Sequence, residues 1–164
     1  MKPNQKITPC LWFVDQAEEA ARFYTSVFPN SSIRDVHRSR ADNPGAKEGA
    51  VLLVSFTLAG QEYLALNGGP HDSFNDAISL SVDCADQVEV DRLWAALMAD
   101  GGKPVQCGWL KDKYGLSWQI VPRRLTELLS DPDLEKGRRV MHAMMQMVKL
   151  DVAALEAAAA GAGA

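Results

Sequence analysis

The side chains in this chain that could do chemistry are few and scattered. The histidines and cysteines are His37, His71, His142, Cys10, Cys84 and Cys107. A zinc site or a disulfide framework normally needs such residues at a recurring close spacing, so we expect no metal, no other cofactor and no disulfide. Cys10 and Cys107 have no histidine or cation nearby in sequence that would activate a thiol, so we interpret both as small apolar residues rather than nucleophiles.

One short polar segment, Lys111 to Gly115, carries a carboxylate between two lysines and then a tyrosine. A polar run between two apolar runs is typical of a solvated hairpin turn. A weaker alternative is that Asp112 or Tyr114 acts as an acid–base group, although nothing in the sequence indicates what would tune it for proton transfer.

The elements that must position these groups occur twice in the chain. Apolar residues repeat at i, i+3, i+4, i+7 and i+8 in two stretches: Ala20, Phe23, Tyr24, Val27 and Phe28, and then Val90, Leu93, Trp94, Leu97 and Met98. This spacing predicts the buried stripe of an amphipathic helix in each stretch.

A strand-like run ending in Val-Asp precedes each helix, and three further strand-like runs follow it. We expect Asp15 and Asp83 to cap the two helices, with Glu18 completing a capping box in the first. A Gly60-Gln61 pair predicts a type II′ hairpin turn. The expected strands cover residues 7–13, 32–40, 51–59, 62–66, 77–83, 105–109 and 117–121. The sequence therefore predicts an α+β fold with two tandem β-α-β-β-β units that form a curved mixed or antiparallel sheet.

Length and charge limit the possible classes of protein. The 164 residues, 47% of them hydrophobic, suffice for one domain, which we divide into half-units 5–70 and 75–123 and a C-terminal helical extension 124–160. A net charge of −4 without a basic stripe argues against a nucleic-acid partner. No apolar run approaches the roughly 20 residues that span a membrane, and the N-terminus does not resemble a signal peptide. We expect a cytoplasmic protein with reduced thiols.

The C-terminal extension is predicted to hold a short helix around Leu125–Leu129 and a longer helix from about Leu134 towards Ala158. The longer helix would carry one apolar stripe formed by Met141, Met144, Met145, Val148, Val152 and Leu155. This is more apolar surface than a terminal helix of a small domain needs. We therefore expect a homodimer in which this helix packs on the partner chain or across a sheet edge.

Several segments resemble a known family. They are TPCLWFVDQAEEAARFYTSVFPNS, LNGGPHDSFNDAISLSVDC, CGWLKDKYGLSWQIVP and MHAMMQMVKLDVAALEAA. Together they are similar to the PhnB-like branch of the vicinal oxygen chelate superfamily, which is often labelled 3-demethylubiquinone-9 3-methyltransferase. The resemblance implies a glyoxalase-like fold. A methyltransferase would usually carry a glycine-rich turn that opens a helix after a strand, whereas Gly68-Gly69 and Gly101-Gly102 occur at a linker and a helix end.

The resemblance also implies four positions at which members of this superfamily hold a divalent metal ion. Alignment on the Val-Asp pairs and the last strand places Thr8, Ala65, Ala77 and Gln119 there. The two alanines offer no ligand atom, so we expect the metal chemistry to be lost.

Strand alternation then predicts a concave lining of small, aromatic and neutral polar side chains. We expect Thr8, Cys10 and Trp12 to face inward with Tyr63, Ala65, Asn67, Ala77, Ser79, Ser81, Ser117, Gln119 and Val121. The expected ligand-binding residues are Cys10, Trp12, Tyr63, Asn67, Phe74, Ser79, Trp109 and Gln119, although Trp12 and Tyr63 would equally serve as packing residues. Such a lining suits a flat, weakly polar ligand.

Three function classes remain open. The first is a metal-independent protein that binds a small aromatic or hydrophobic molecule, and the second is an enzyme acting on a quinone-like or other aromatic substrate. The third is a dimeric scaffold with a vestigial pocket.

Overall fold

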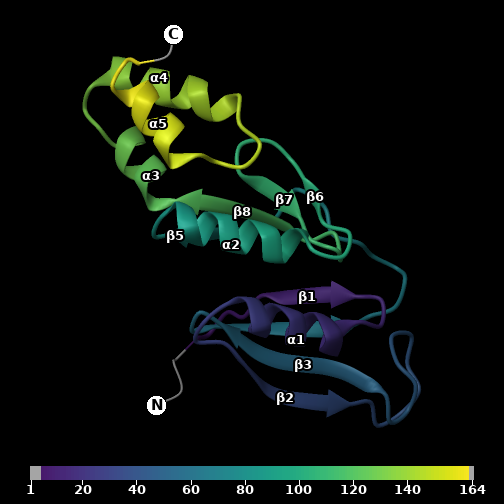
Figure 1. The fold of residues 1–164 in the computed structure, drawn as a ribbon. Helices are drawn as coiled ribbons and strands as arrows, with labels where there is room; N and C mark the ends of the chain where they lie inside the picture. The colour runs from purple at the N-terminus through teal and green to yellow at the C-terminus, as the bar shows by residue number, and fades with distance from the viewer. Residues whose placement is uncertain (1–4, 163–164) are drawn as a thin grey trace. The chain divides into compact units, whose positions relative to one another are not determined.

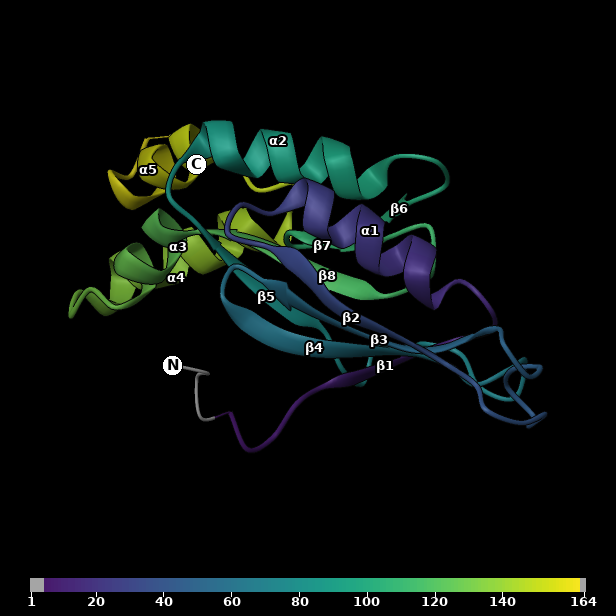
Figure 2. The same ribbon diagram turned by 90° about the horizontal axis from the view of Figure 1, so that it is seen from below.

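The computed structural model describes residues 5–162, and the chain divides into two compact units between Phe74 and Asn75. The first unit contains β1 (Cys10–Phe13), α1 (Ala17–Val27), β2 (Ser32–Arg38), β3 (Val51–Leu58) and β4 (Gln61–Asn67). Its sheet has the order β1-β4-β3-β2, with β1 parallel to β4 and the other pairs antiparallel. Helix α1 lies across one face of this sheet (Figure 2).

The second unit repeats this connectivity (Figure 1). It contains β5 (Leu80–Cys84), α2 (Gln87–Met98), β6 (Lys103–Pro104), β7 (Trp109–Lys111) and β8 (Ser117–Pro122) in the order β5-β8-β7-β6. Strand β5 is parallel to β8, as β1 is to β4. The predicted pair of β-α-β-β-β units is therefore confirmed.

The predicted helix stripes form the core on one face of each sheet. In the first unit Tyr24 of α1 is fully buried, and its ring stacks on Phe56 with centroids 6.5 Å apart. Phe56 in turn stacks on Tyr63 at 5.7 Å. In the second unit Val90, Leu93 and Leu97 of α2 are fully buried. Burying large apolar side chains supplies the main driving force for each unit to fold.

The prediction that Asp15 and Asp83 cap the helices is wrong. Helix α1 follows Gln16, whose side chain makes no capping hydrogen bond, and Asp83 instead pairs with Arg123. The N-cap positions are Gln16 in α1 and Asp86 in α2, so neither Asp15 nor Asp83 occupies one. Asp86 caps α2 by accepting from Glu89 N, and Glu89 reaches back to Ala85 N, so the capping box belongs to the second helix.

Helix α1 is capped by a residue of the neighbouring strand β4, which ends beside the end of β1. Asn67, the last residue of β4, accepts a hydrogen bond at Oδ1 from Ala17 N at 2.8 Å and donates from Nδ2 to Val51 O at 2.9 Å. The side chain thus ties α1, β3 and β4 together. Because Asn67 is 6% exposed, these hydrogen bonds are shielded from water.

The hairpin between β3 and β4 also differs from its prediction by one residue. Leu58 pairs with Gln61, so the turn is Ala59-Gly60, and both residues have positive φ, at 47° and 84°. Two consecutive positive φ angles define a type I′ turn, which matches the twist of the flanking strands. The predicted Gly60-Gln61 turn of type II′ is therefore wrong.

The C-terminal segment forms three helices, α3 (Arg123–Leu129), α4 (Leu134–Met145) and α5 (Val152–Ala159), gathered near the end of β8 (Figure 1). The single long helix predicted from Leu134 to Ala158 is wrong, because the chain between α4 and α5 is pinned to a loop of the second unit. Cys107 N donates to Met147 O and Gly108 N donates to Val148 O, at 2.8 and 2.7 Å. Asp133 and Asp151 cap α4 and α5.

These three helices enclose their own apolar cluster. It consists of Leu125, Leu128, Val140, Leu150, Leu155 and Ala159, with Val121, Leu129, Met144 and Met147 packed against it. The predicted stripe is therefore divided, since Leu155 and Met144 pack within the chain while Met141, Met145 and Val148 stay exposed. None of the helices in residues 5–162 is both long and apolar enough to cross a membrane.

Replacing Asn67 tests the cap described above. Asn67→Ala should lower the free energy of unfolding by about 3 kcal/mol, because it leaves Ala17 N and Val51 O buried without partners. In Asn67→Asp one carboxylate oxygen still accepts from Ala17 N at the helix N-terminus, which favours a negative charge. The other oxygen faces Val51 O with no hydrogen between them, so the loss should be smaller than for Asn67→Ala but still measurable. Urea unfolding followed by circular dichroism measures both. Equal losses for the two variants would show that the capping hydrogen bond is not the stabilising one.

Candidate functional site

The sheet face opposite α1, which we call the open face of unit 1, carries a mixture of apolar and polar side chains. Strand pairing places Cys10 beside Leu64 and Trp12 beside Leu66, and places Ser55 opposite Leu64. Thr8 and Glu62 occupy the next positions on the same face, two residues earlier on each strand. Among residues 5–74, the only helix is α1, which packs on the other face.

The register corrects part of the predicted lining. Because Cys10 lies beside Leu64, the side chains of Tyr63, Ala65 and Asn67 point to the α1 side of the sheet. Ala65 is fully buried, Asn67 caps α1, and Tyr63 stacks on Phe56. Burial also raises the pKa of the Tyr63 phenol. The expectation that these three residues share a face with Cys10 and Trp12 is wrong.

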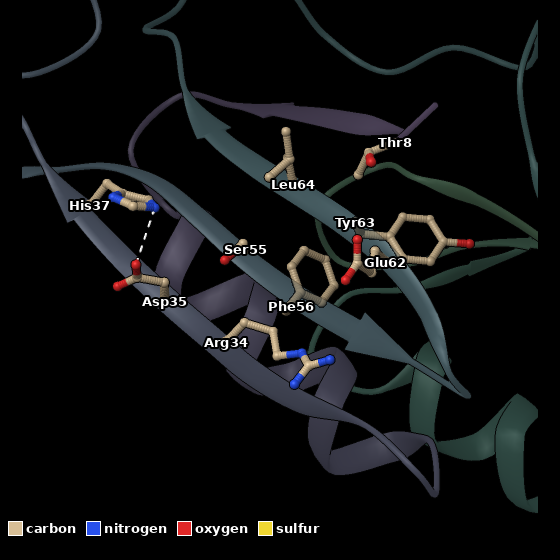
Figure 3. A pocket seen from close by; sticks show the side chains of 9 residues that line it. All are labelled: Thr8, Arg34, Asp35, His37, Ser55, Phe56, Glu62, Tyr63 and Leu64. Atoms are coloured by element: carbon tan, nitrogen blue, oxygen red, sulfur yellow. Dashed lines mark ion pairs between the residues drawn. The ribbon is translucent and has the colours of Figure 1, made fainter. Parts of the chain in front are cut away.

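A hollow of about 510 Å³ lies on unit 1 along β2, β3 and β4 (Figure 3). It is lined by Thr8, Arg34, Asp35, His37, Ser55, Phe56, Glu62, Tyr63 and Leu64. His37 Nε2 and Asp35 Oδ2 are 3.4 Å apart on β2. The hollow thus offers both signs of charge as well as hydroxyl groups, and it is more polar than the sequence predicted.

Sequence analysis missed several of these residues. It placed His37 in the predicted strand 32–40 but gave this strand no part in a site, and it did not single out Arg34, Asp35 or Ser55. A signal was present, because Ser55 interrupts the apolar run of β3, Val51–Leu58, and a polar residue within such a run indicates a face without apolar cover.

Trp12 and Phe74 are held by contacts within unit 1. Trp12 Nε1 donates to Gly69 O at 2.9 Å. Its ring lies so close to Gly68 that a Cβ there would come within 2.2 Å of the indole, which explains the glycine at this position. Phe74 meets Phe13 edge to face, with centroids 5.4 Å apart. Both aromatic rings are half-buried.

In unit 2, small polar side chains lie on the sheet face opposite Trp118 and Ile120 of β8. Gln119 pairs across the strands with Ser81 and with Trp109, and its Nε2 donates to Ser79 Oγ at 2.9 Å. Ser117 Oγ donates to Asp76 Oδ1 at 3.0 Å. Trp118 and Ile120 alternate with Ser117 and Gln119 along β8, and both are buried apolar residues of the core.

The segment Lys111–Gly115 is not the solvated turn that was predicted. Asp112 is 3% exposed, and its Oδ1 accepts from Tyr114 N and Leu116 N while its Oδ2 accepts from Trp118 Nε1 at 2.9 Å. The carboxylate therefore closes the β7–β8 hairpin and orients the indole. These contacts explain the residue physically without an acid–base role.

Two cysteines have environments that disfavour a thiolate. Burial, followed by the charges of Glu89 and Asp83, raises the pKa of Cys84 to about 12. Desolvation also raises the pKa of Cys10, although its side chain is exposed on the open face of unit 1. Neither thiol is activated as a nucleophile.

The residues do not fit a divalent metal ion. Within residues 5–162 no group of three or more histidine, cysteine, aspartate or glutamate side chains could hold one. Of the four positions predicted from the resemblance, Ala65 turns towards α1, and the amide of Gln119 is bonded to Ser79. Glu62 and Thr8 lie at adjacent positions on the open face of unit 1, but one carboxylate and one hydroxyl make a weak ligand set.

The repeated β-α-β-β-β units, each with a helix packed on its sheet, form the glyoxalase-like fold that the sequence resemblance implies. Residues 5–121 match the model of the family described as 3-demethylubiquinone-9 3-methyltransferase. The chain belongs to this family.

Solved structures agree with this assignment. A putative 3-demethylubiquinone-9 3-methyltransferase, PhnB protein, from Bacillus cereus is 39% identical, with 72% of this chain and 99% of that chain covered and a TM-score of 0.65. A protein from Pseudomonas aeruginosa is 18% identical, with 70% and 95% covered and a TM-score of 0.57, and shares the fold. Comparison with curated proteins gives no match.

The family match ends at residue 121, within β8. Helices α3, α4 and α5 follow it, so they form an extension beyond the matched region. Nearly the whole length of the Bacillus cereus protein is already covered by 72% of this chain.

Changing Asp112 tests its structural role. In Asp112→Asn the amide oxygen can still accept from the backbone, but the amide nitrogen faces the Trp118 N–H, so two donors oppose each other. We expect a loss of about 2 kcal/mol in the free energy of unfolding and a shifted tryptophan emission. Adding Trp118→Phe removes one donor, so the double variant should lose less than the two single losses together. Additive losses in urea unfolding would contradict this pairing.

Proposed function

We propose that this protein binds a small, flat molecule without a metal ion, using the open face of unit 1. The observation that carries the proposal is the hollow of about 510 Å³ on this unit. A concave site with apolar surface and a few polar groups is the usual form of a small-molecule site. Leu64 supplies apolar surface, while Thr8, Ser55 and Glu62 supply hydroxyl and carboxylate partners for polar substituents on the ligand.

The corrected register changes which predicted residues support the proposal. Cys10 and Trp12 remain next to Leu64 and Leu66 on the open face. Asn67 caps α1, so we do not count it among the ligand-binding residues. Tyr63 borders the hollow, although its ring stacks on Phe56. In unit 2, Ser79, Trp109 and Gln119 form a second polar and aromatic surface that we keep as a ligand-binding proposal, with Phe74 in unit 1.

The second candidate function is an enzyme acting on a quinone-like or other aromatic substrate, and the family description favours it. The glycine pairs do not support a binding site for S-adenosylmethionine. Gly68 makes room for Trp12, and a Cβ at Gly102 would clash with Met98 at the end of α2. A methyl-transfer assay with S-adenosylmethionine and a demethylated quinone separates the two candidates, because turnover would favour the enzyme.

We also propose a homodimer in the cytoplasm, as the sequence analysis expects. Among the described residues of unit 1, the only helix packs on one face of the sheet, and an uncovered face with apolar side chains favours association. A scaffold with a vestigial pocket would form the same dimer but bind no ligand, so the ligand tests below distinguish it.

Filling the hollow should abolish binding. We expect simple benzoquinones and 1,4-naphthoquinone to raise the thermal unfolding midpoint of the unmodified protein. Leu64→Trp should weaken binding about tenfold or more, because an indole occupies the space of the ligand. Val88→Trp is the control, since Val88 is 75% exposed on α2. Isothermal titration calorimetry measures the dissociation constants, and equal affinities for the two variants would place the ligand elsewhere.

Metal analysis tests the proposed metal independence. Protein purified without added metal should contain far less than one divalent ion per chain, and a chelator should leave quinone binding unchanged. Stoichiometric zinc, nickel, iron or manganese whose removal abolishes binding would refute this part of the proposal.

A further inference from the structure

Methionine is concentrated in one short stretch of the chain. Four of the six methionines lie within residues 141–147, and a histidine lies among them. Met144 and Met147 pack against the apolar cluster of the three C-terminal helices. Met141 and Met145 are instead 42% and 50% exposed. Packing within the chain therefore accounts for the first pair of methionines but not for the second pair.

Met141, His142 and Met145 lie on the same side of α4, and we call them the Met-His cluster. A spacing of four residues places Met141 and Met145 one above the other, with Cβ atoms about 5–6 Å apart. His142 lies three residues before Met145 and next to Met141. All three side chains line one depression of about 500 Å³. Because methionine side chains are long and flexible, both sulfur atoms can reach the same point beside the imidazole.

The charged side chains around the Met-His cluster already have partners. Asp131 lines the same depression and pairs with Lys136 at 2.6 Å, and Arg138 pairs with Glu135 at 2.8 Å. Each of these ion pairs offsets its own charge. The donor atoms that remain in the lining are therefore two neutral thioether sulfurs and the imidazole of His142.

The chemistry of these donor atoms selects the kind of ion that they could hold. Thioether ligands are soft and favour Cu(I), and imidazole is also a copper ligand. A hard divalent ion favours carboxylate or carbonyl oxygens, which the Met-His cluster does not supply. This agrees with the finding that no group of histidine, cysteine, aspartate and glutamate side chains within residues 5–162 could hold a metal ion.

We propose that the Met-His cluster binds a soft monovalent metal ion, Cu(I), through the sulfur atoms of Met141 and Met145 and one imidazole nitrogen of His142. The site belongs to α4 and thus to the extension that follows the family match. It goes beyond the function proposed above, since the binding of a flat molecule to the open face of unit 1 does not depend on it.

Titration with Ag(I) tests the site directly, because Ag(I) is as soft as Cu(I) and keeps its oxidation state in air. The full chain is labelled with ¹³C at the methionine methyl groups and followed by nuclear magnetic resonance. Thiols also bind soft ions, so the titrated chain carries Cys10→Ser and Cys107→Ser, while Cys84 is fully buried.

The methyl resonances of Met141 and Met145 should shift together and stop shifting at one Ag(I) per chain. The resonance of Met98, a half-buried residue at the end of α2, should stay unchanged. Unmoved resonances of Met141 and Met145, or an equal shift at Met98, would overturn the site. Zn(II) should shift none of these resonances, and binding of Zn(II) as tight as that of Ag(I) would overturn the selectivity for a soft ion.

Substitutions in the same chain identify the ligands. Met141→Leu and Met145→Leu preserve side-chain volume, so both variants should fold, and each should raise the Kd for Ag(I) about tenfold or more. Met98→Leu is the matched control and should leave the Kd unchanged. Isothermal titration calorimetry measures these constants, and equal values for Met141→Leu and Met98→Leu would overturn the site.

His142→Gln tests the imidazole separately. The variant should weaken Ag(I) binding while the methyl resonances of Met141 and Met145 still shift at higher Ag(I) concentration, because both thioethers remain. An unchanged Kd would overturn the assignment of His142 as a ligand. Under anaerobic conditions Cu(I) should displace Ag(I) and shift the same two resonances, and failure to do so would overturn the assignment of the ion.

Discussion

The structure depends on hydrogen-bond partners for buried backbone groups. In each unit one polar side chain supplies them. Asp112 accepts three N–H groups inside the β7–β8 hairpin, and Asn67 joins the first amide of α1 to the carbonyl of Val51. A buried polar group without a partner costs more than an ordinary hydrogen bond supplies. These two residues therefore fix where the β7–β8 hairpin closes and where α1 starts. Which sheet face stays open depends on both positions.

Periodicity was sufficient to predict the repeated units, because the apolar spacing of α1 and α2 directly reflects the face that each helix buries. The sheet face on which each side chain of β4 lies could not be predicted in the same way. Its side chains are oriented by pairing with β1, which lies fifty residues away in sequence, and Tyr63 and Ala65 suit either face by residue type. The cap at Asn67 has the same origin, since no local pattern reveals that a strand end will meet a distant helix start. The segment between α4 and α5 is likewise fixed by its contacts with Cys107 and Gly108.

The fold and the family can be assigned from the whole chain, whereas the chemistry of the site depends on individual side chains. The β-α-β-β-β repeat establishes the fold, and the match over residues 5–121 establishes the family. The chemistry depends on a few side chains, and here the hollow of unit 1 offers hydroxyl groups, the guanidinium of Arg34, the paired His37 and Asp35, and Glu62. Such groups orient a ligand by hydrogen bonds rather than polarise it as a metal ion would. This contrast is why binding is the function that the geometry supports best.

The backbone contacts of Met147 and Val148 also affect the behaviour of the sheet in unit 2. Strand β6 is only two residues long, so it leaves the amides of Cys107 and Gly108 beyond its reach. The segment after α4 accepts both of these hydrogen bonds. An unpaired sheet edge is a template for uncontrolled strand addition and aggregation. The C-terminal extension thus shields an edge that the short β6 would otherwise leave open, and this protection links the solubility of the unit to residues outside the β-α-β-β-β repeat.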